Sequence, residues 1–199
     1  RAGWLFPSGS LWMDGYVTDR YCCDYANRNW SDFASSGPTI ELDVGARLAR
    51  SYTVFGFWEL ASLGTGDTLG GEFGGQNRGV SHHIGAGLRF STNPDDIGML
   101  VEVGLGYRRF DASWKNGTEL AARDGLLNTR IGLGMNIRFS PQFVLSPMAM
   151  LGGGSFEKIE WAFADGSKGG AFSELSRAGQ HTTASLQVGA HFDWLGSQD

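Results

Sequence analysis

Apolar and polar residues alternate with a period of two in several segments, each about 9–13 residues long. This period is typical of β-strands, in which successive side chains point to opposite faces. The pattern is clearest in segments 39–48, 80–91, 99–107, 127–139 and 182–194. Segments 52–63 and 143–156 are strand-like without a clean phase, and a first strand is expected within Ser10–Val17. The sequence therefore predicts an all-β chain with eight strands.

The links between these strands alternate between short and long. The short links carry turn residues such as Asn93, Pro94 and Pro141. Long polar links are expected at 19–37, 64–79, 111–125 and 157–180. In an up-and-down meander alternate links lie at the same end, so the long links gather there. Pro147 lies inside a predicted strand and cannot donate to the ladder, so a local distortion is expected around it.

The composition of the polar face indicates that it points into the barrel. It combines glycine with Arg, Glu, Asp, Asn and His. The interior of an eight-stranded barrel is only wide enough to be filled by side chains, so long charged residues need glycine neighbours there. All three lysines, Lys115, Lys158 and Lys168, fall in long links, whereas the strands use arginine, the better partner for buried carboxylates. The opposite charges nearly cancel, as burial requires. The expected interior network comprises Glu41, Asp43, Arg47, His83, Arg89, Glu102, Arg108, Arg130, Asn136, Arg138, His191 and Asp193, joined by Glu59 if its strand has the matching phase.

Aromatic residues on the apolar face lie near the short-turn ends of successive strands. Phe90, Phe139, Phe192 and Trp194 form this set, which is typical of an interfacial girdle. Trp58, Tyr107 and Trp114 are candidates for a girdle at the other end. Residues 1–199 are therefore predicted to form one domain, an eight-stranded antiparallel up-and-down transmembrane β-barrel with short periplasmic turns and long extracellular loops.

The last predicted strand resembles the C-terminal β-signal that the outer-membrane assembly machinery recognises. The matching residues are Gln187, Gly189, Phe192 and Trp194, although residues 195–199 follow where many barrels stop. Together with the loop asymmetry, the chain resembles small bacterial outer-membrane proteins of the OmpA-barrel, OmpX and OmpW type. The resemblance implies a bacterial outer-membrane location, with outer-membrane lipids, lipopolysaccharide and the assembly machinery as partners.

Several other kinds of function are disfavoured. Sixteen basic against 21 acidic residues give a net charge of −5, which argues against nucleic-acid binding. No cofactor or metal is predicted, because His82 and His83 point to opposite faces of one strand. His181 and Ser185 are four residues apart on a strand, about 13 Å, which is too far for a nucleophile and its base. Cys22 and Cys23 are adjacent and make no disulfide framework.

We therefore predict a non-enzymatic integral outer-membrane protein. Its role is structural, or an interaction with an extracellular partner through the long loops, or a narrow gated path for small solutes. Two alternatives place the chain elsewhere: a soluble lipocalin-like ligand-binding barrel with its apolar face inside, or an outer-membrane lipid-modifying enzyme. Arg109 should face outward near the loop end, where it either meets lipopolysaccharide phosphates or acts as an interfacial anchor.

Overall fold

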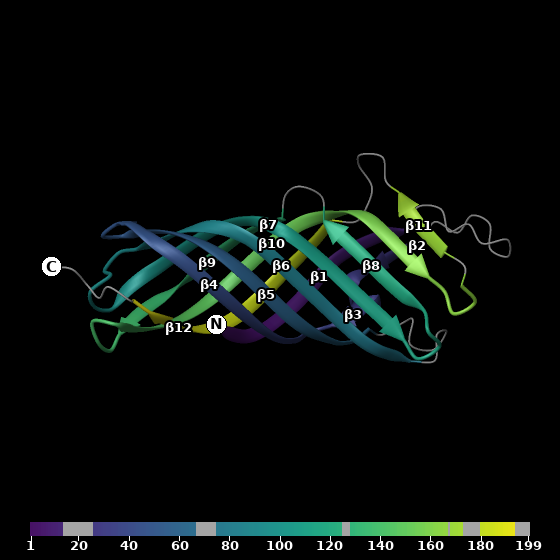
Figure 1. Ribbon diagram of the computed structural model, residues 1–199, viewed down its shortest axis with the longest axis horizontal. Helices are drawn as coiled ribbons and strands as arrows, with labels where there is room; N and C mark the ends of the chain where they lie inside the picture. The colour runs from purple at the N-terminus through teal and green to yellow at the C-terminus, as the bar shows by residue number, and fades with distance from the viewer. Residues whose placement is uncertain (14–25, 67–74, 125–127, 167, 173–179, 194–199) are drawn as a thin grey trace.

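The computed structural model of this protein describes residues 1–13, 26–66, 75–124, 128–166, 168–172 and 180–193 (Figure 1). One three-residue 3₁₀ turn, η1 (Trp30–Asp32), accompanies the strands. The strands are β1 (Ala2–Met13), β2 (Ala26–Asn29), β3 (Ala34–Ser35), β4 (Gly37–Ala49), β5 (Tyr52–Thr65), β6 (Gln76–Ser91), β7 (Gly98–Trp114), β8 (Glu119–Asp124), β9 (Asn128–Arg138), β10 (Phe143–Ala162), β11 (Lys168–Phe172) and β12 (Gln180–Phe192). In the part of the chain described here, no helix is long and apolar enough to cross a membrane.

The strands close into a ring with eight positions, as predicted. Strands β4, β5, β6 and β7 pair in sequence order, and β10 pairs with β12. One position is shared by β8 and β9, which follow each other along the wall and both pair with β7 and β10. Strand β1 closes the ring because it pairs with both β12 and β4. All of these pairings are antiparallel, as in an up-and-down barrel.

The first strand lies earlier in the chain than the sequence predicted. The expected span was Ser10–Val17, whereas β1 covers Ala2–Met13, and residues 14–17 lie outside the described part. Residues 2–9 pair continuously with β12 even though Pro7 and Gly9 interrupt the strand-like composition. Pairing along an existing edge has therefore outweighed weak local strand propensity.

The predicted long loops contain a large amount of strand. Within 111–125, β7 continues to Trp114 and β8 begins at Glu119. Within 157–180, β10 continues to Ala162 and β11 pairs with it. Segments 19–37 and 64–79 likewise contain β2, β3 and the ends of β4, β5 and β6. The polar, glycine-rich composition therefore concealed β-hairpins that project beyond the main ring at one end (Figure 1).

Pro147 interrupts one ladder without shifting its register. Between β10 and β9, the pairs Leu145–Ile137 and Met148–Gly134 belong to one register, and the residues between them are unpaired. On its other side Pro147 pairs with Val188 in an unbroken register. The distortion expected there is thus a local gap, because proline lacks the backbone donor for only one neighbour.

The apolar faces of the ring strands point outward, as predicted. On β4, Leu42 has 61% of its surface exposed, whereas the adjacent Glu41 has 0%. This arrangement is the reverse of that in a soluble ligand-binding barrel, so the lipocalin-like alternative is wrong. We call the outward apolar surface the apolar band; it includes Trp4, Phe6, Ile40, Leu42, Val44, Leu48, Val54, Trp58, Ile84, Leu88, Met99, Val103, Leu105, Tyr107, Ile131, Leu133, Met135, Leu151, Leu186, Val188 and Phe192.

Beyond the apolar band, towards the long-loop end, strands β5, β7, β8 and β10 place apolar side chains inward instead of outward. On β7, Phe110, Ala112 and Trp114 are buried, while the outward positions between them are polar. We call this part of the barrel the extension; it comprises 61–65, 76–82, 109–114, 119–124 and 156–162. Its enclosed apolar core contains Leu5, Trp30, Phe33, Ala34, Ala61, Leu63, Phe110, Ala112, Trp114, Leu120, Ala122, Phe156 and Ile159.

A bulge in β10 allows this strand to place apolar side chains inside the extension. The register to β8 shifts between Phe156 and Lys158, so that both Phe156 and Ile159 are buried inside. The same core shows that Trp114 belongs to no girdle, because only 2% of its surface is exposed. Trp114 lies near a loop end, as predicted, but it points inward instead of outward. The reason is that the polarity of β7 reverses between the band and this residue.

Candidate functional site: the barrel interior

Three carboxylates and three guanidinium groups meet inside the barrel, within the level of the apolar band. The buried carboxylate of Glu102 forms ion pairs at 2.5, 3.0 and 2.6 Å with Arg1, Arg89 and Arg130, respectively. Glu41 pairs with Arg130 at 2.6 Å, and Asp43 pairs with Arg89 at 2.5 Å. Opposite charges are equal in number, which offsets the large desolvation cost of burying them. This central cluster consists of Arg1, Arg89, Arg130, Glu41, Asp43 and Glu102.

Glycine and aromatic rings create the space in which the arginines lie. A Cβ atom at Gly104 would stand 3.2 Å from Cγ and Nε of Arg130, closer than ordinary packing. On the other side, the Arg130 guanidinium lies over the Phe57 ring with its Cζ atom 3.4 Å from the centroid. Arg89 lies similarly over Phe55 at 4.5 Å. These cation–π contacts explain why two aromatic residues face a charged interior.

A second polar group lies next to the central cluster, towards the extension. Arg108 pairs with Glu59 at 2.9 Å and donates a hydrogen bond to the Ser81 hydroxyl at 2.9 Å. Its guanidinium is also 3.0 Å from Nδ1 of His83. The Gln187 amide donates to Glu59 at 3.3 Å, which brings β12 into the same network. Buried polar groups are thus connected from wall to wall, which rigidifies an interior more than isolated pairs do.

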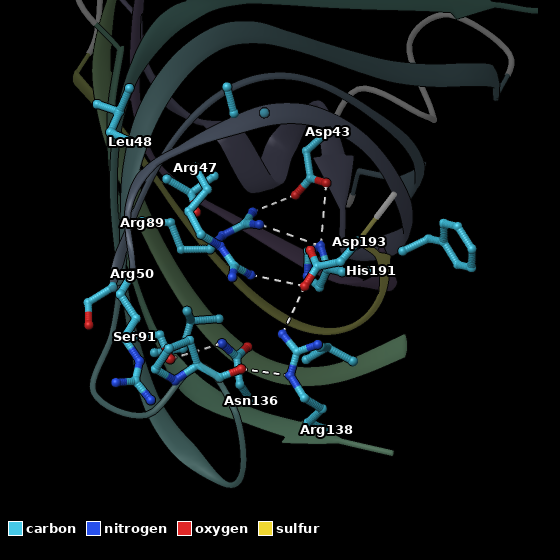
Figure 2. Close-up of a pocket in the computed structure, with 18 of the residues that line it drawn as sticks. Asp43, Arg47, Leu48, Arg50, Arg89, Ser91, Asn136, Arg138, His191 and Asp193 are labelled. Atoms are coloured by element: carbon cyan, nitrogen blue, oxygen red, sulfur yellow. Dashed lines mark hydrogen bonds and ion pairs between the residues drawn. The ribbon is translucent and has the colours of Figure 1, made fainter. Parts of the chain in front are cut away.

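At the short-turn end, the interior opens into a hollow of about 1080 Å³. Asp193 accepts ion pairs from Arg47 at 3.0 Å and from Arg138 at 2.8 Å. In Figure 2, Arg47 and Arg89 are drawn on one side of the hollow, Asp193 and His191 on the other, and Arg50 lies apart near the turn. Hydrogen bonds from Arg138 to two turn carbonyls, those of Pro94 and Pro141, fix the turns at this rim.

At the opposite end, the apolar core of the extension closes the interior. The Trp30 ring contacts Phe110 and Phe156 with centroids 5.4 and 5.2 Å apart, and all three side chains are fully buried. His181 stacks on Phe156 at 4.2 Å, and its Nε2 atom is 2.9 Å from the Asn128 amide. This packing forms an apolar plug between the polar network and the long-loop end.

The structure divides the predicted interior network into three groups. Glu41, Asp43, Arg89, Glu102, Arg130 and His191 meet in or beside the central cluster, Arg108 and His83 meet next to it, and Arg47, Arg138 and Asp193 meet at the short-turn end. Asn136 donates to Ser91 and accepts from Ser146 instead of joining an ion pair.

Sequence reasoning missed Arg1, Phe55 and Phe57 as interior residues. Phe55 and Phe57 lie at odd positions of β5 on the same face as Glu59, so a phase taken from Glu59 would have found them. Arg1 precedes the first strand and carried no pattern. Its side chain is 1% exposed and reaches Glu41, Asp43 and Glu102.

The predicted aromatic girdle falls partly within the described residues. Phe139 and Phe192 are exposed on the outer face, and Phe90 packs against Tyr52 with centroids 5.1 Å apart. In the assembly-signal motif, Gln187 is buried in the network and Phe192 faces outward, while Gly189 lies on β12 between them. Trp194, which belongs to both predicted sets, lies outside the described residues, as do Cys22 and Cys23.

The histidines adopt separate environments. His82 faces outward and stacks on Trp58, whereas His83 is buried inside. His181 and Ser185 bond elsewhere, to Asn128 and Gln187 respectively. Among the described residues, no group of three His, Cys, Asp or Glu side chains has a metal-binding arrangement.

Charges on the outer face of the extension form pairs exposed to solvent. Arg109 faces outward, as expected, and donates to Asp111 at 2.9 Å, a hydrogen bond that raises the pKa of Arg109. Glu160 pairs with Lys158 at 2.7 Å and with Arg123 at 3.3 Å. The hydrogen bond from Lys158 holds the pKa of Glu160 below its usual value. These charges mark where the exterior changes from apolar to polar.

Comparison with known proteins shows a likeness at the level of the fold. No protein-family model matches the chain, and no curated protein matches it. The crystal structure of Ail, the attachment invasion locus protein of Yersinia pestis, resembles it with a TM-score of 0.45 and 14% sequence identity. The likeness covers 96% of this chain and 93% of that chain.

The class of protein follows from the geometry itself. A closed antiparallel ring leaves no unpaired edge in lipid, and an apolar exterior around a polar interior suits a bilayer and not water. The chain is therefore a transmembrane β-barrel of the bacterial outer-membrane type, with its short turns and its long hairpins at opposite ends.

Proposed function

We propose that this protein is a non-enzymatic, non-conducting barrel that anchors a rigid β-extension at the cell surface. The observation that carries this proposal is a double closure of the interior. The central cluster fills the barrel at the level of the apolar band, and the apolar plug of Trp30, Phe110 and Phe156 fills the extension. A solute path would have to cross both a paired polar barrier and a dry apolar one.

The two closures resist opening for different reasons. Moving Arg130 aside would leave Glu41 and Glu102 short of a partner in a buried site, which is strongly unfavourable. Moving Trp30 would open a cavity among aromatic rings, which costs packing and buried area. The two barriers depend on different side chains and different interactions, so loss of one leaves the other's own contacts in place.

The surface available for an interaction lies at the long-loop end. Strands β8, β10 and β11 form one projecting hairpin system, and β1 with β2 forms another (Figure 1). Binding surfaces on rigid strands lose little conformational entropy on association. This supports an extracellular partner that contacts the hairpins, as expected for the long links from the sequence.

Single-channel recording in planar bilayers tests the closed interior. We expect no stable conductance from the wild-type protein or from either single variant, Arg130→Ala or Trp30→Ala. The double variant, which weakens both barriers, should show intermittent conductance. Stable conductance of the wild type that changes in Arg130→Ala would instead establish the narrow gated path and overturn the proposal.

Absence of enzymatic activity is tested separately. Expression of the protein in a Gram-negative host should leave the lipid A and phospholipid composition unchanged by mass spectrometry. A new acylated or deacylated species that depends on Ser185 or His181 would establish the lipid-modifying alternative.

A further inference from the structure

Four neighbouring strands each place one basic residue at the same level of the outer wall. The register pairs His82 of β6 with Arg109 of β7, and Arg109 with Arg123 of β8. It then pairs Arg123 with Lys158 of β10. All four side chains point outward, and the row spans about 14 Å at ordinary strand spacing. We call these four residues the basic row.

The basic row lies directly beyond the apolar band. On β7, Tyr107 belongs to the band and Arg109, the next outward residue, belongs to the row. On β6, Ile84 and His82 are related in the same way, and His82 stacks on Trp58 with centroids 6.2 Å apart. Given the membrane-spanning class derived above, on which this inference rests, this is the depth of lipid head groups.

The row places like charges directly opposite each other. Arg109 faces Arg123 across one ladder, and Arg123 faces Lys158 across the next. Directly opposed like charges destabilise a sheet unless an anion lies between them. The carboxylates of Asp111 and Glu160 already offset part of this repulsion, and an anionic ligand between Arg109 and Arg123 would offset more of it.

Three carboxylates lie near the three charged side chains of the row. Asp111 pairs with Arg109, and Glu160 is shared between Arg123 and Lys158. Further from the band, Arg78 and Glu119 have opposite signs and offset each other. Glu157 is exposed at the bulge beside the row.

The arginine and lysine side chains of the row remain accessible. Those of Arg109, Arg123 and Lys158 are 47%, 38% and 41% exposed. Beside the row, on the side away from the band, a hollow of about 560 Å³ is lined by Arg78, His82 and Arg109 and by three carboxylates, those of Asp111, Glu119 and Glu160, but not by Arg123 or Lys158. A ligand with its apolar part against Tyr107 and its anionic part between Arg109 and Arg123 would contact both the apolar band and the basic row.

We propose that the basic row binds the phosphate groups of an anionic lipid in the leaflet at the long-loop end. Arginine side chains offer planar pairs of donors that match phosphate oxygens, and lysine adds a point charge. The phosphate takes the position between Arg109 and Arg123, where the opposed charges otherwise repel. The acyl chains then lie along the apolar band below Tyr107.

Lipid binding to the folded, detergent-solubilised protein can be measured by native mass spectrometry. The probe is phosphatidic acid, compared with phosphatidylcholine carrying the same acyl chains. We expect phosphatidic acid to bind the wild type about tenfold more tightly, and the Arg109→Gln/Arg123→Gln variant to lose this preference. The control Arg50→Gln removes an exposed arginine at the short-turn end and should retain it.

A second variant acts in the opposite direction and does not depend on the arginine variant folding. Glu160→Gln releases Arg123 and Lys158 from their shared carboxylate, so affinity for phosphatidic acid should rise about threefold. An excess of inorganic phosphate that displaces the lipid equally well would show a site for free phosphate instead. Equal binding of both lipids, or equal loss in Arg50→Gln, would overturn the proposal.

The state of the barrel is monitored in the same samples. Heated and unheated samples of each variant should migrate differently in electrophoresis when the barrel is folded. A normal mobility shift without lipid preference would refute lipid binding by the basic row but not the barrel. Loss of the shift in the wild type would refute the assignment as a membrane barrel.

Discussion

Strand β7 passes through both the apolar band and the extension, and its outward residues are apolar in the first and polar in the second. Within the apolar band, Val103 and Leu105 face outward while Glu102 is buried. Beyond the band, Asp111 faces outward while Phe110 and Trp114 are buried. The strand alternates throughout, so the surroundings and not the period decide which side is polar.

This difference shows how one wall is stable in two solvents. In lipid, an apolar exterior is favourable and the interior can be polar if every charge is paired. In water, the exterior must be hydrated, so apolar side chains contribute most when they form an inner core. The extension therefore behaves as a small water-soluble β-structure that continues a membrane barrel.

The largest expected effect tests the polar half. Glu102→Ala removes the carboxylate shared by three arginines and should lower the free energy of unfolding by about 3–5 kcal/mol. Urea titration in lipid vesicles, followed by electrophoretic mobility, measures the change. Glu119→Ala, at an exposed position of the extension, should change it by less than about 0.5 kcal/mol. Equal effects would mean that the interior pairs are not buried.

The corresponding test in the extension removes core packing. Leu120→Ala should destabilise the barrel by about 2–5 kcal/mol, because Leu120 is 2% exposed within the apolar core. The same urea titration applies, with limited proteolysis to locate local unfolding at the long-loop end. A change below about 0.5 kcal/mol would contradict a packed core there.

Two substitutions that each introduce an arginine on the outer face of β7 locate the boundary between the apolar band and the extension. Val103→Arg places a charge on the lipid-facing band and should cost about 2–4 kcal/mol. Ser113→Arg places the same charge outward on the extension and should be nearly neutral. Unfolding in vesicles and in detergent should separate the two variants. A large cost at Ser113 would move the boundary towards the long-loop end.

The smallest expected effect concerns an exposed pair in the extension. Lys158→Gln should change stability by only about 0–1 kcal/mol because both partners are solvated. It should also raise the pKa of Glu160 towards its ordinary value, because the hydrogen bond that lowers it is lost. In the wild type the pair persists above the ordinary glutamate pKa and is lost as pH falls through the lowered pKa. NMR titration of the Glu160 carboxyl carbon measures the shift, and an unchanged pKa would contradict the pairing.

Much of the membrane half was predictable because one physical rule covers it. Regular alternation identified the outward faces of β4, β6, β7, β9 and β12, and charge type identified Glu102 and Arg130 as interior residues. The extension was not predictable by that rule, because its polarity is reversed and its polar residues resembled loops. Trp114 illustrates the failure: a residue placed correctly near a strand end was assigned to the wrong face.

The sequence by itself determined a period-two chain with balanced interior charges, because alternation and residue type are local properties. Only the tertiary structure decided that Arg1 joins the central cluster and that Trp30 closes the extension, because both depend on contacts between distant segments. The basic row is of the same kind. Arg109, Arg123 and Lys158 lie on three different strands, and the strand register brings them to one level.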